Sequence, residues 1–187
     1  MSDVVLFASV SVDGFSAGPF GDVTRLHRWM EGDNNERNGP VDDFTRDFSS
    51  AGAIVFGRRT YDAGREPWAD EEVFHTPVFV VTHEPLAPVV KNGTIFTFVD
   101  GEPHDILCLA RSAAGDHNVV IMGSADVAQQ FLRANLVDII TLHQVPVLLG
   151  AGTRLFAELE DPVDLTPDPS IVSRGVQLQR FRVTRPR

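Results

Sequence analysis

Cysteine is almost absent from this chain. Its 187 residues include a single cysteine, Cys108, so an internal disulfide and a zinc site built on several thiolates are excluded. Cationic residues are also scarce, because 16 Lys and Arg stand against 26 Asp and Glu, for a formal net charge of -10. Since nucleic-acid binding needs clustered cations, we expect no nucleic-acid partner. Binding of one anionic cofactor needs only a local positive site and is compatible with this charge.

Long apolar runs are missing as well. No stretch approaches the roughly 20 apolar residues that span a bilayer. The first apolar run is interrupted by Ser9, Ser11 and Asp13 and has no basic residue before it, so no secretory signal is predicted. We expect a cytoplasmic protein without a membrane partner.

The remaining composition is typical of a globular protein. The chain is 43% hydrophobic and 22% charged, far from the composition of a disordered polyelectrolyte. It contains no repeat, low-complexity tract or linker. We therefore predict one domain that spans residues 1–187.

Apolar β-forming segments alternate with amphipathic segments along most of the chain. Residues 4–12 form a well-buried strand that ends at the turn pair Asp13-Gly14, and residues 13–22 form a flexible loop. The other expected strands are residues 53–56, 78–81, 95–98, 118–122 and 137–147, with an antiparallel closing strand or hairpin in 171–183, and the expected helices are residues 22–30, 42–50, 106–114 and 125–134. This order predicts an α/β three-layer sandwich with a mainly parallel central sheet.

Common catalytic motifs are absent, including the phosphate-binding loop GxxxxGK[ST], the GxGxxG fingerprint, the GxSxG elbow and HExxH. Residues 150–152, Gly-Ala-Gly, begin like a dinucleotide fingerprint but lack the third glycine. We interpret them as a turn.

The end of strand 53–56 is the first candidate anion site. Gly57 permits close backbone approach, Arg58 and Arg59 offer charge-assisted donors to phosphate, and Thr60 can cap the next helix. The alternative is a pair of solvated arginines beside a capped helix, and the spacing alone leaves both open.

Two further strand ends carry anion-binding groups. Gly123, Ser124 and Ala125 open a helix whose free N–H groups attract anions, although Ser124 as a simple helix cap is an alternative. Thr82 and His83 follow strand 78–81, and both side chains can donate hydrogen bonds. Because ligands gather at the carboxyl ends of parallel strands, the three ends together suggest a site for a phosphorylated dinucleotide.

These segments resemble the dihydrofolate-reductase-like superfamily, in the branch of the RibD C-terminal type, the reductase domain of riboflavin biosynthesis. The resemblance covers nearly the whole chain, in the order ASVSVDGFSAG at 8–18, VFGRRTYD at 55–62, VFVVTHEP at 78–85 and IMGSADVAQQFLRANLVDIITLHQVPVLLGAGTRLF at 121–156. It implies a dihydrofolate-reductase-like fold with about eight strands, a cytoplasmic reductase, and NADPH bound across the strand ends.

The resemblance also implies roles for residues. Arg58 would meet the 2′-phosphate of NADPH. The remaining cofactor contacts would be Arg59, Thr60, Gly123, Ser124 and Ala125 at the diphosphate, Thr82 and His83 at the adenosine, and the backbone around Ala8 and Ser9 at the nicotinamide carboxamide, with Gly57 also at the cofactor. The loop over 13–22 would close over the nicotinamide.

One position departs from the family pattern. In true dihydrofolate reductases a carboxylate lies three residues before a tryptophan, and aligning that tryptophan with Trp29 puts Leu26 at the acid position. Leucine relays no proton, so reduction of dihydrofolate itself is not expected. Asp13 is a substitute acid, an orienting group, or simply a turn residue before Gly14. Trp29 is a wall of the substrate pocket or part of the core.

The resemblance favours an NADPH-dependent reductase that transfers hydride to a C=N or C=O carbon of a small, riboflavin-pathway or pterin-like heterocycle. A catalytically silent ligand-binding module is the alternative that Leu26 motivates, and a flavin protein is a third. No metal is expected, because the histidines lack ligand spacing; we assign packing or surface roles to His27, His75, His104, His117 and His143. A homodimer is expected, formed by edge pairing of the tail with residues 137–149.

Overall fold

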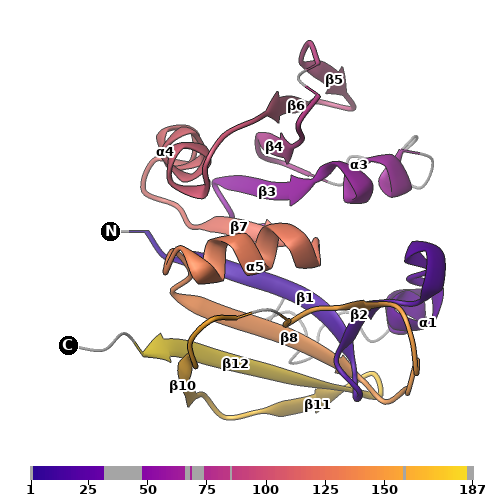
Figure 1. The fold of residues 1–187 in the computed structure, drawn as a ribbon. Coiled ribbons are helices and arrows are strands. Elements are labelled where there is room, and N and C mark those ends of the chain that lie inside the picture. Colours follow the sequence, from indigo (N-terminus) through magenta and orange to yellow (C-terminus); the bar gives the residue numbers. More distant parts are fainter. Residues whose placement is uncertain are drawn as a thin grey trace.

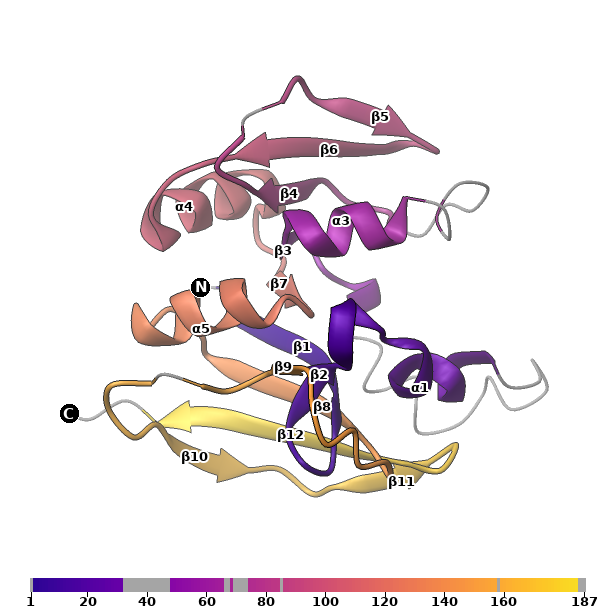
Figure 2. The ribbon, with the colours of Figure 1, turned by 45° about the vertical axis from the view of Figure 1, so that its right-hand side comes forward.

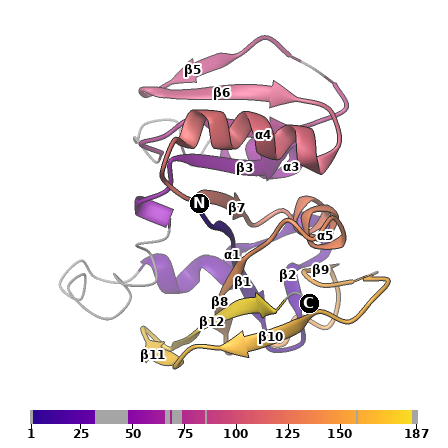
Figure 3. The same cartoon turned by 90° about the vertical axis from the view of Figure 1, so that its left-hand side faces the viewer.

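A ten-stranded sheet organises the chain. The structure, a computed structural model, describes residues 2–31, 48–65, 68, 74–84, 86–157 and 159–184. The sheet order is β10-β12-β8-β1-β7-β3-β4-β6-β5, with β11 beside β12, and a separate small sheet joins β2 and β9. Figures 2 and 3 show this succession from β5 and β6 at the top to β10 and β11 at the bottom.

The six central strands run parallel to one another. They are β8 (Ile139–Val145), β1 (Val4–Ser11), β7 (Val119–Met122), β3 (Ala53–Gly57), β4 (Val78–Val81) and β6 (Thr94–Val99). Their carboxyl ends therefore lie along one edge of the sheet, on the right for β1 and β3 in Figure 1. This is the edge at which open α/β sheets bind ligands.

The two faces of the sheet bury different cores. Val4 and Leu6 of β1 pack in a cluster with residues of α4 (Pro103–Ala114) and α5 (Ala125–Arg133). Val5, on the opposite face, packs in a cluster with Tyr61 of α3 (Arg58–Gly64). Leu26 of α1 (Thr24–His27) caps a third cluster over β8 and β12. This arrangement of helices on both sides confirms the three-layer α/β prediction.

The sheet is larger than the expected eight strands because several short strands lack a strong pattern. Val89–Lys91 (β5) forms a hairpin with β6 across the turn Asn92-Gly93, a dipeptide that favours such turns. β10 (Asp164–Pro167) and β11 (Ile171–Ser173) also belong to this sheet, whereas β2 (Phe15–Ala17) and β9 (Thr153–Arg154) form the separate small one. Strands this short depend on a neighbour that only the tertiary structure supplies.

Two local predictions need correction. The loop after β1 is not wholly irregular, because β2 pairs with β9 and Pro19–Gly21 forms the 3-10 turn η1. The helix expected over 22–30 is two short pieces, α1 and the 3-10 turn η2 (Arg28–Glu31). Asp22 does support the start, since its carboxylate accepts from Thr24 N at 2.9 Å. Most of the helix expected over 42–50 lies outside the described residues.

The C-terminal prediction is confirmed as a hairpin of β11 with β12 (Val176–Thr184). β12 also pairs antiparallel with β8, and β8 pairs with β1 on its other side. The two segments expected to join subunits thus pair with each other inside one chain, so that route to a dimer is wrong. Association itself stays a prediction. No helix in the described part of the chain is long and apolar enough to cross a membrane.

Truncation of Phe131 tests the core beneath α5. Phe131 is 1% exposed and packs against β1, so Phe131→Ala removes a large buried ring and leaves a cavity. We expect a loss of about 3–5 kcal/mol in the free energy of unfolding, measured by urea denaturation. The matched control is Leu109→Ala on α4, where the side chain is 51% exposed and the expected change is within roughly 0.5 kcal/mol. Equal losses of stability in the two variants would contradict the assignment of Phe131 to a buried helix face and of Leu109 to an exposed one.

Candidate functional site

The hydroxyl of Ser124 joins the ends of two parallel strands. Gly57 N, at the end of β3, donates to Ser124 Oγ at 2.7 Å. Thr60 Oγ1, in the first turn of α3, lies 2.6 Å from the same oxygen. The loop after β7 and the start of α3 are therefore held together by one side chain.

This contact corrects two predictions about helix caps. Ser124 makes no side-chain cap to α5, and its backbone adopts the left-handed region with φ of 45°. Thr60 lies inside the first turn of α3, with Gly57 in the cap position. Because neither hydroxyl caps its helix, the N–H groups at the start of α5 are left to other acceptors. A Cβ at Gly57 would lie 3.3 Å from Ser124 Oγ, so a larger residue there would crowd this contact.

β1 extends beyond the end of its neighbour β7. Phe7 pairs with Met122, the last residue of β7, and Gly123 N donates to Phe7 O at 2.9 Å, whereas β1 pairs with β8 as far as Ser11. Alternate residues of a parallel strand direct N–H and C=O to the same side, so those of Ser9 also face β7. Past Gly123, none of the described residues pairs with them. Ser9 therefore presents an open amide donor and acceptor.

The predicted neighbour Ala8 does not share this property. Val4 O accepts from Asp138 N and Val12 N donates to Val147 O, so the even residues of β1 direct their backbone groups toward β8. Those of Ala8 belong to that ladder, so of the two predicted residues only Ser9 directs its backbone groups away from β8.

The two predicted arginines begin α3. Arg58 Nε donates to both carboxylate oxygens of Asp62, at 2.9 and 3.0 Å, and its guanidinium lies 5.9 Å from the ring centre of Phe98. Arg59 is exposed. A phosphate at this end of the sheet would meet Arg59 directly but would compete with Asp62 for Arg58.

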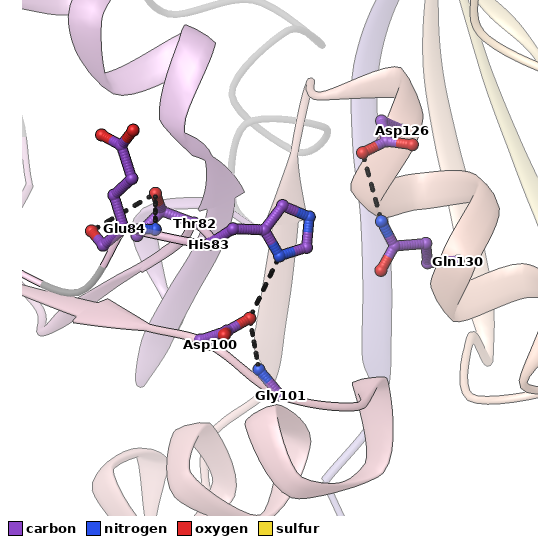
Figure 4. A network of polar contacts seen from close by, with 7 residues as sticks. All are labelled: Thr82, His83, Glu84, Asp100, Gly101, Asp126 and Gln130. Carbon is purple, nitrogen blue, oxygen red and sulfur yellow. Dashed lines mark hydrogen bonds and ion pairs between the residues drawn. The ribbon is translucent and has the colours of Figure 1, made fainter.

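Thr82 and His83 lie at the end of β4, beside β6. Thr82 is buried, and its hydroxyl accepts from Glu84 N at 3.1 Å. The His83 ring is 97% exposed, with Nδ1 at 3.2 Å from Asp100 Oδ1. In Figure 4 this ring projects from the strand end toward the side where Asp126 of α5 lies. Asp100 and Asp126 carry negative charge on this side, so the end of β4 is less favourable for a phosphate than the end of β3, where Arg58 and Arg59 lie.

Asp13 connects two loops at the end of β1. Its Oδ1 accepts from Ser11 Oγ at 2.6 Å and from Leu149 N at 3.1 Å, while Oδ2 accepts from Gly150 N at 2.7 Å. The Ser11 hydroxyl, and then the Gly150 and Leu149 N–H groups, lower the pKa of Asp13 to about 2. At neutral pH the side chain is a carboxylate without a proton to give, so the geometry favours an orienting group over an acid.

The family's acid position is apolar in three dimensions as well as in sequence. Leu26 is fully buried in a cluster with Val145, Val176 and Leu178, against which Trp29 packs. The Trp29 indole also meets the His143 ring edge-on, with ring centres 4.7 Å apart. Trp29 therefore belongs to the core and at the same time faces a polar ring.

His143 is packed in the interior, which is one of the two roles predicted for it, but its position beside Ser9 was not predicted. It lies on β8 directly beside Ser9 of β1, is 1% exposed, and contacts the Phe7 ring at 4.6 Å. Burial, with a smaller contribution from the nearby His27, lowers the pKa of His143 to about 4. The available signal was a polar residue inside the otherwise apolar strand 137–147, since a buried polar group is more informative than an exposed one.

The structure thus brings most predicted residues to one edge. The Ser124 hydroxyl contacts Gly57 and Thr60 directly, and Arg58 and Arg59 lie between those two residues at the start of α3. Ser9 lies on β1, the strand beside β7. Thr82 and His83 follow β4, which lies farther from β1 in the same sheet. Across the described residues, no group of three His, Cys, Asp or Glu side chains is placed to hold a metal ion.

Known proteins are similar to this chain in sequence or in fold. The family model described as the RibD C-terminal domain matches residues 2–178. "Uncharacterized protein YwjB" of Bacillus subtilis is 24% identical over 166 residues, which is 86% of each chain. A putative riboflavin biosynthesis protein from Shewanella sp. PV-4 has a crystal structure that superposes with a TM-score of 0.79, at 26% identity over 98% of this chain and 99% of that one.

Two more distant structures share the fold. A pyrimidine reductase-like protein from Corynebacterium diphtheriae gives a TM-score of 0.66 at 15% identity, over 99% of this chain and 93% of its own. A deaminase and reductase from Thermotoga maritima gives 0.67 at 15% identity, over 98% of this chain but 57% of its own length.

Ser124→Ala tests the junction between β3 and β7. The variant leaves the half-buried Gly57 N–H without its partner, so we expect a loss of about 1–3 kcal/mol in the free energy of unfolding, by urea denaturation. Thr60→Ala removes one hydroxyl partner and leaves Gly57 N bonded, so its loss is expected to be smaller. If Thr60→Ala costs as much as Ser124→Ala, the shared hydroxyl is not the main connection.

Asp13→Asn tests the charged state of the loop anchor. Because the pKa of Asp13 is lowered from 3.8 to about 2 in the folded chain, its ionised form stabilises the fold above about pH 4, and this stabilisation disappears as the pH falls through 2. We expect the stability difference between wild type and Asp13→Asn to be largest at pH 5–7 and to shrink toward pH 2, in urea titrations at each pH. A difference that is independent of pH would refute the assignment.

Proposed function

We propose that this chain, which belongs to the RibD C-terminal domain family, is an NADPH-dependent reductase. It would act on a C=N or C=O carbon of a small heterocyclic substrate. The proposal also draws on the similar protein of Shewanella, which is named for riboflavin biosynthesis. Its substrate would be a riboflavin-pathway or pterin-like ring.

The observation that supports the proposal most is that β1 continues past the point where its neighbour β7 ends. Ser9 offers one N–H and one C=O beyond Gly123, next to the start of α5. A primary carboxamide has one acceptor and a donor pair, so it complements this open amide. The nicotinamide carboxamide of the cofactor would bind there, with its ring beside β1.

The phosphates would extend from Ser9 toward β3. The uncapped N–H groups at the start of α5 and the dipole of that helix favour the diphosphate, and Arg59 adds an exposed cation. Arg58 would bind the 2′-phosphate after leaving Asp62. Thr82 and His83 would meet the adenosine at the end of β4.

The cofactor, when bound, supplies a hydride, and the chain's residues orient and shield the reacting groups. Ser9 would fix the plane of the nicotinamide through two hydrogen bonds. Asp13 would hold the loop of residues 11–17 against residues 147–155, where Leu155 N also donates to Gly14 O at 3.0 Å. The proton for the substrate nitrogen or oxygen would come from water, since Asp13 is ionised.

A catalytically silent ligand-binding module is the second candidate. The specific observation in its favour is Leu26, which is fully buried among apolar side chains at the family's acid position. Steady oxidation of NADPH with any member of a ketone, pterin and pyrimidine panel would exclude it.

Fluorescence titration with NADPH and NADH tests the cofactor assignment. A charge-assisted contact from Arg58 to the 2′-phosphate contributes about 1.5–3 kcal/mol, so we expect NADPH to bind roughly 10–150-fold more tightly than NADH. Arg58→Ala is expected to abolish most of that preference, because NADH has no 2′-phosphate. Equal affinity of the wild type for both cofactors would reject the assignment.

Two further variants sharpen this titration. Arg133→Ala, at the far end of α5, is the matched control and should leave the preference intact. Asp62→Asn releases Arg58 from its exposed ion pair and should tighten NADPH binding about 1.4–5-fold, the equivalent of about 0.2–1 kcal/mol. Weaker binding in Asp62→Asn would mean that Asp62 positions Arg58 for the cofactor instead of competing with it.

A further inference from the structure

Three buried nitrogen atoms lie on two facing rings without a partner in the described part of the chain. They are Nδ1 and Nε2 of His143 and Nε1 of Trp29. The rings meet edge-on with centres 4.7 Å apart. Buried polar groups are nearly always hydrogen-bonded, because an unpaired one forfeits its hydrogen bonds to water. Three such atoms in one place point to a partner that the described residues do not provide.

The surroundings of these rings define what that partner is. His143 contacts the Phe7 ring at 4.6 Å and pairs in register with Ser9 on one side and Leu178 on the other. Trp29 packs against the apolar cluster that contains Leu26. A flat, largely apolar ring suits these aromatic and aliphatic side chains, and the nearby His27, which lowers the pKa of His143, disfavours a cationic ring.

The hydrogen-bonding groups of Trp29 and His143 restrict the class of ligand further. The indole N–H is a donor only, and a neutral imidazole has one donor and one acceptor. The complementary ligand edge has an acceptor for the indole beside a donor for the imidazole. A ring C=O next to a ring N–H, that is, a lactam edge, has this pattern and pairs two of the three atoms, the indole nitrogen and one imidazole nitrogen.

We propose that His143 and Trp29 are substrate-binding residues that hold the lactam edge of an uncharged planar heterocycle. His143 provides from strand β8 the polar contact that Leu26 does not provide from α1. The choice of a reducible ring rests on the proposed function, whereas the binding of a lactam to this ring pair does not. Ser9, one strand away from His143, would bring the nicotinamide to the same ring.

The experiment uses the indole N–H signals of the ¹⁵N-labelled full chain. The chain has two tryptophans, so two signals are expected, and Trp29→Phe assigns them. The probe is quinolin-2-one, and 1-methylquinolin-2-one is its matched control because it lacks the lactam N–H. We expect the Trp29 signal to move on titration with quinolin-2-one, and the N-methyl compound to bind more weakly by roughly 5-fold or more.

Two variants of His143 separate ligand binding from packing. In His143→Leu we expect quinolin-2-one to bind roughly 5–100-fold more weakly. We also expect Tm to rise by about 2–6 °C, because an apolar side chain replaces an unpartnered polar one. His143→Gln, which keeps a donor and an acceptor, should recover part of the binding. His104→Leu, on the exposed surface of α4, should change neither quantity.

The outcomes distinguish this inference from the proposed function. If quinolin-2-one leaves the Trp29 signal unchanged, or if His143→Leu lowers Tm and binds the probe as the wild type does, His143 has a packing role and the inference is wrong. If the probe binds through His143 while NADPH does not bind, the inference stands and the reductase proposal fails. If NADPH binds normally to His143→Leu while the probe is lost, both stand.

Discussion

The unequal length of two paired parallel strands is the constraint on which the candidate site depends. β7 stops at Met122 while β1 continues along β8 to Ser11, so one side of β1 loses its hydrogen-bonding neighbour. The chain then turns through Gly123 and Ser124 into α5, and the Ser124 hydroxyl anchors that turn to Gly57 of β3. As a result, three features lie next to one another: the open backbone amide of Ser9, the start of α5, and the start of α3 with its two arginines.

Hydrogen bonds between loops hold the loops at this edge of the sheet in place. Asp13 accepts from Ser11 and from the N–H groups of Leu149 and Gly150, and thereby connects the loop after β1 to the loop after β8. Three donors keep its carboxylate ionised, which suits an anchor and disqualifies a proton donor at neutral pH. The residue that resembled a substitute acid in the sequence is better described as the support of the loop.

The face of the sheet opposite α4 and α5 combines apolar packing with polar groups that no described residue pairs. On the face covered by α4 and α5, Phe131 and its neighbours form a continuous apolar core. On the other face, the apolar packing around Leu26 gives way to His143 and Trp29, whose ring nitrogens have no partner among the described residues. Unpartnered polar groups at such a depth oppose folding, and a bound ligand that pairs with them would offset that cost.

The sequence by itself determined the three-layer class, the principal parallel strands, the helices after β6 and β7, and the glycine and arginine residues at the strand ends. These follow from local periodicity and turn chemistry, which depend on near neighbours along the chain. Tertiary structure alone decided the pairing of β2 with β9, the partner of the Ser124 hydroxyl, the open amide of Ser9 and the burial of His143. Each of these depends on which distant strand lies alongside and where it stops, and such long-range register leaves no mark in a short stretch of sequence.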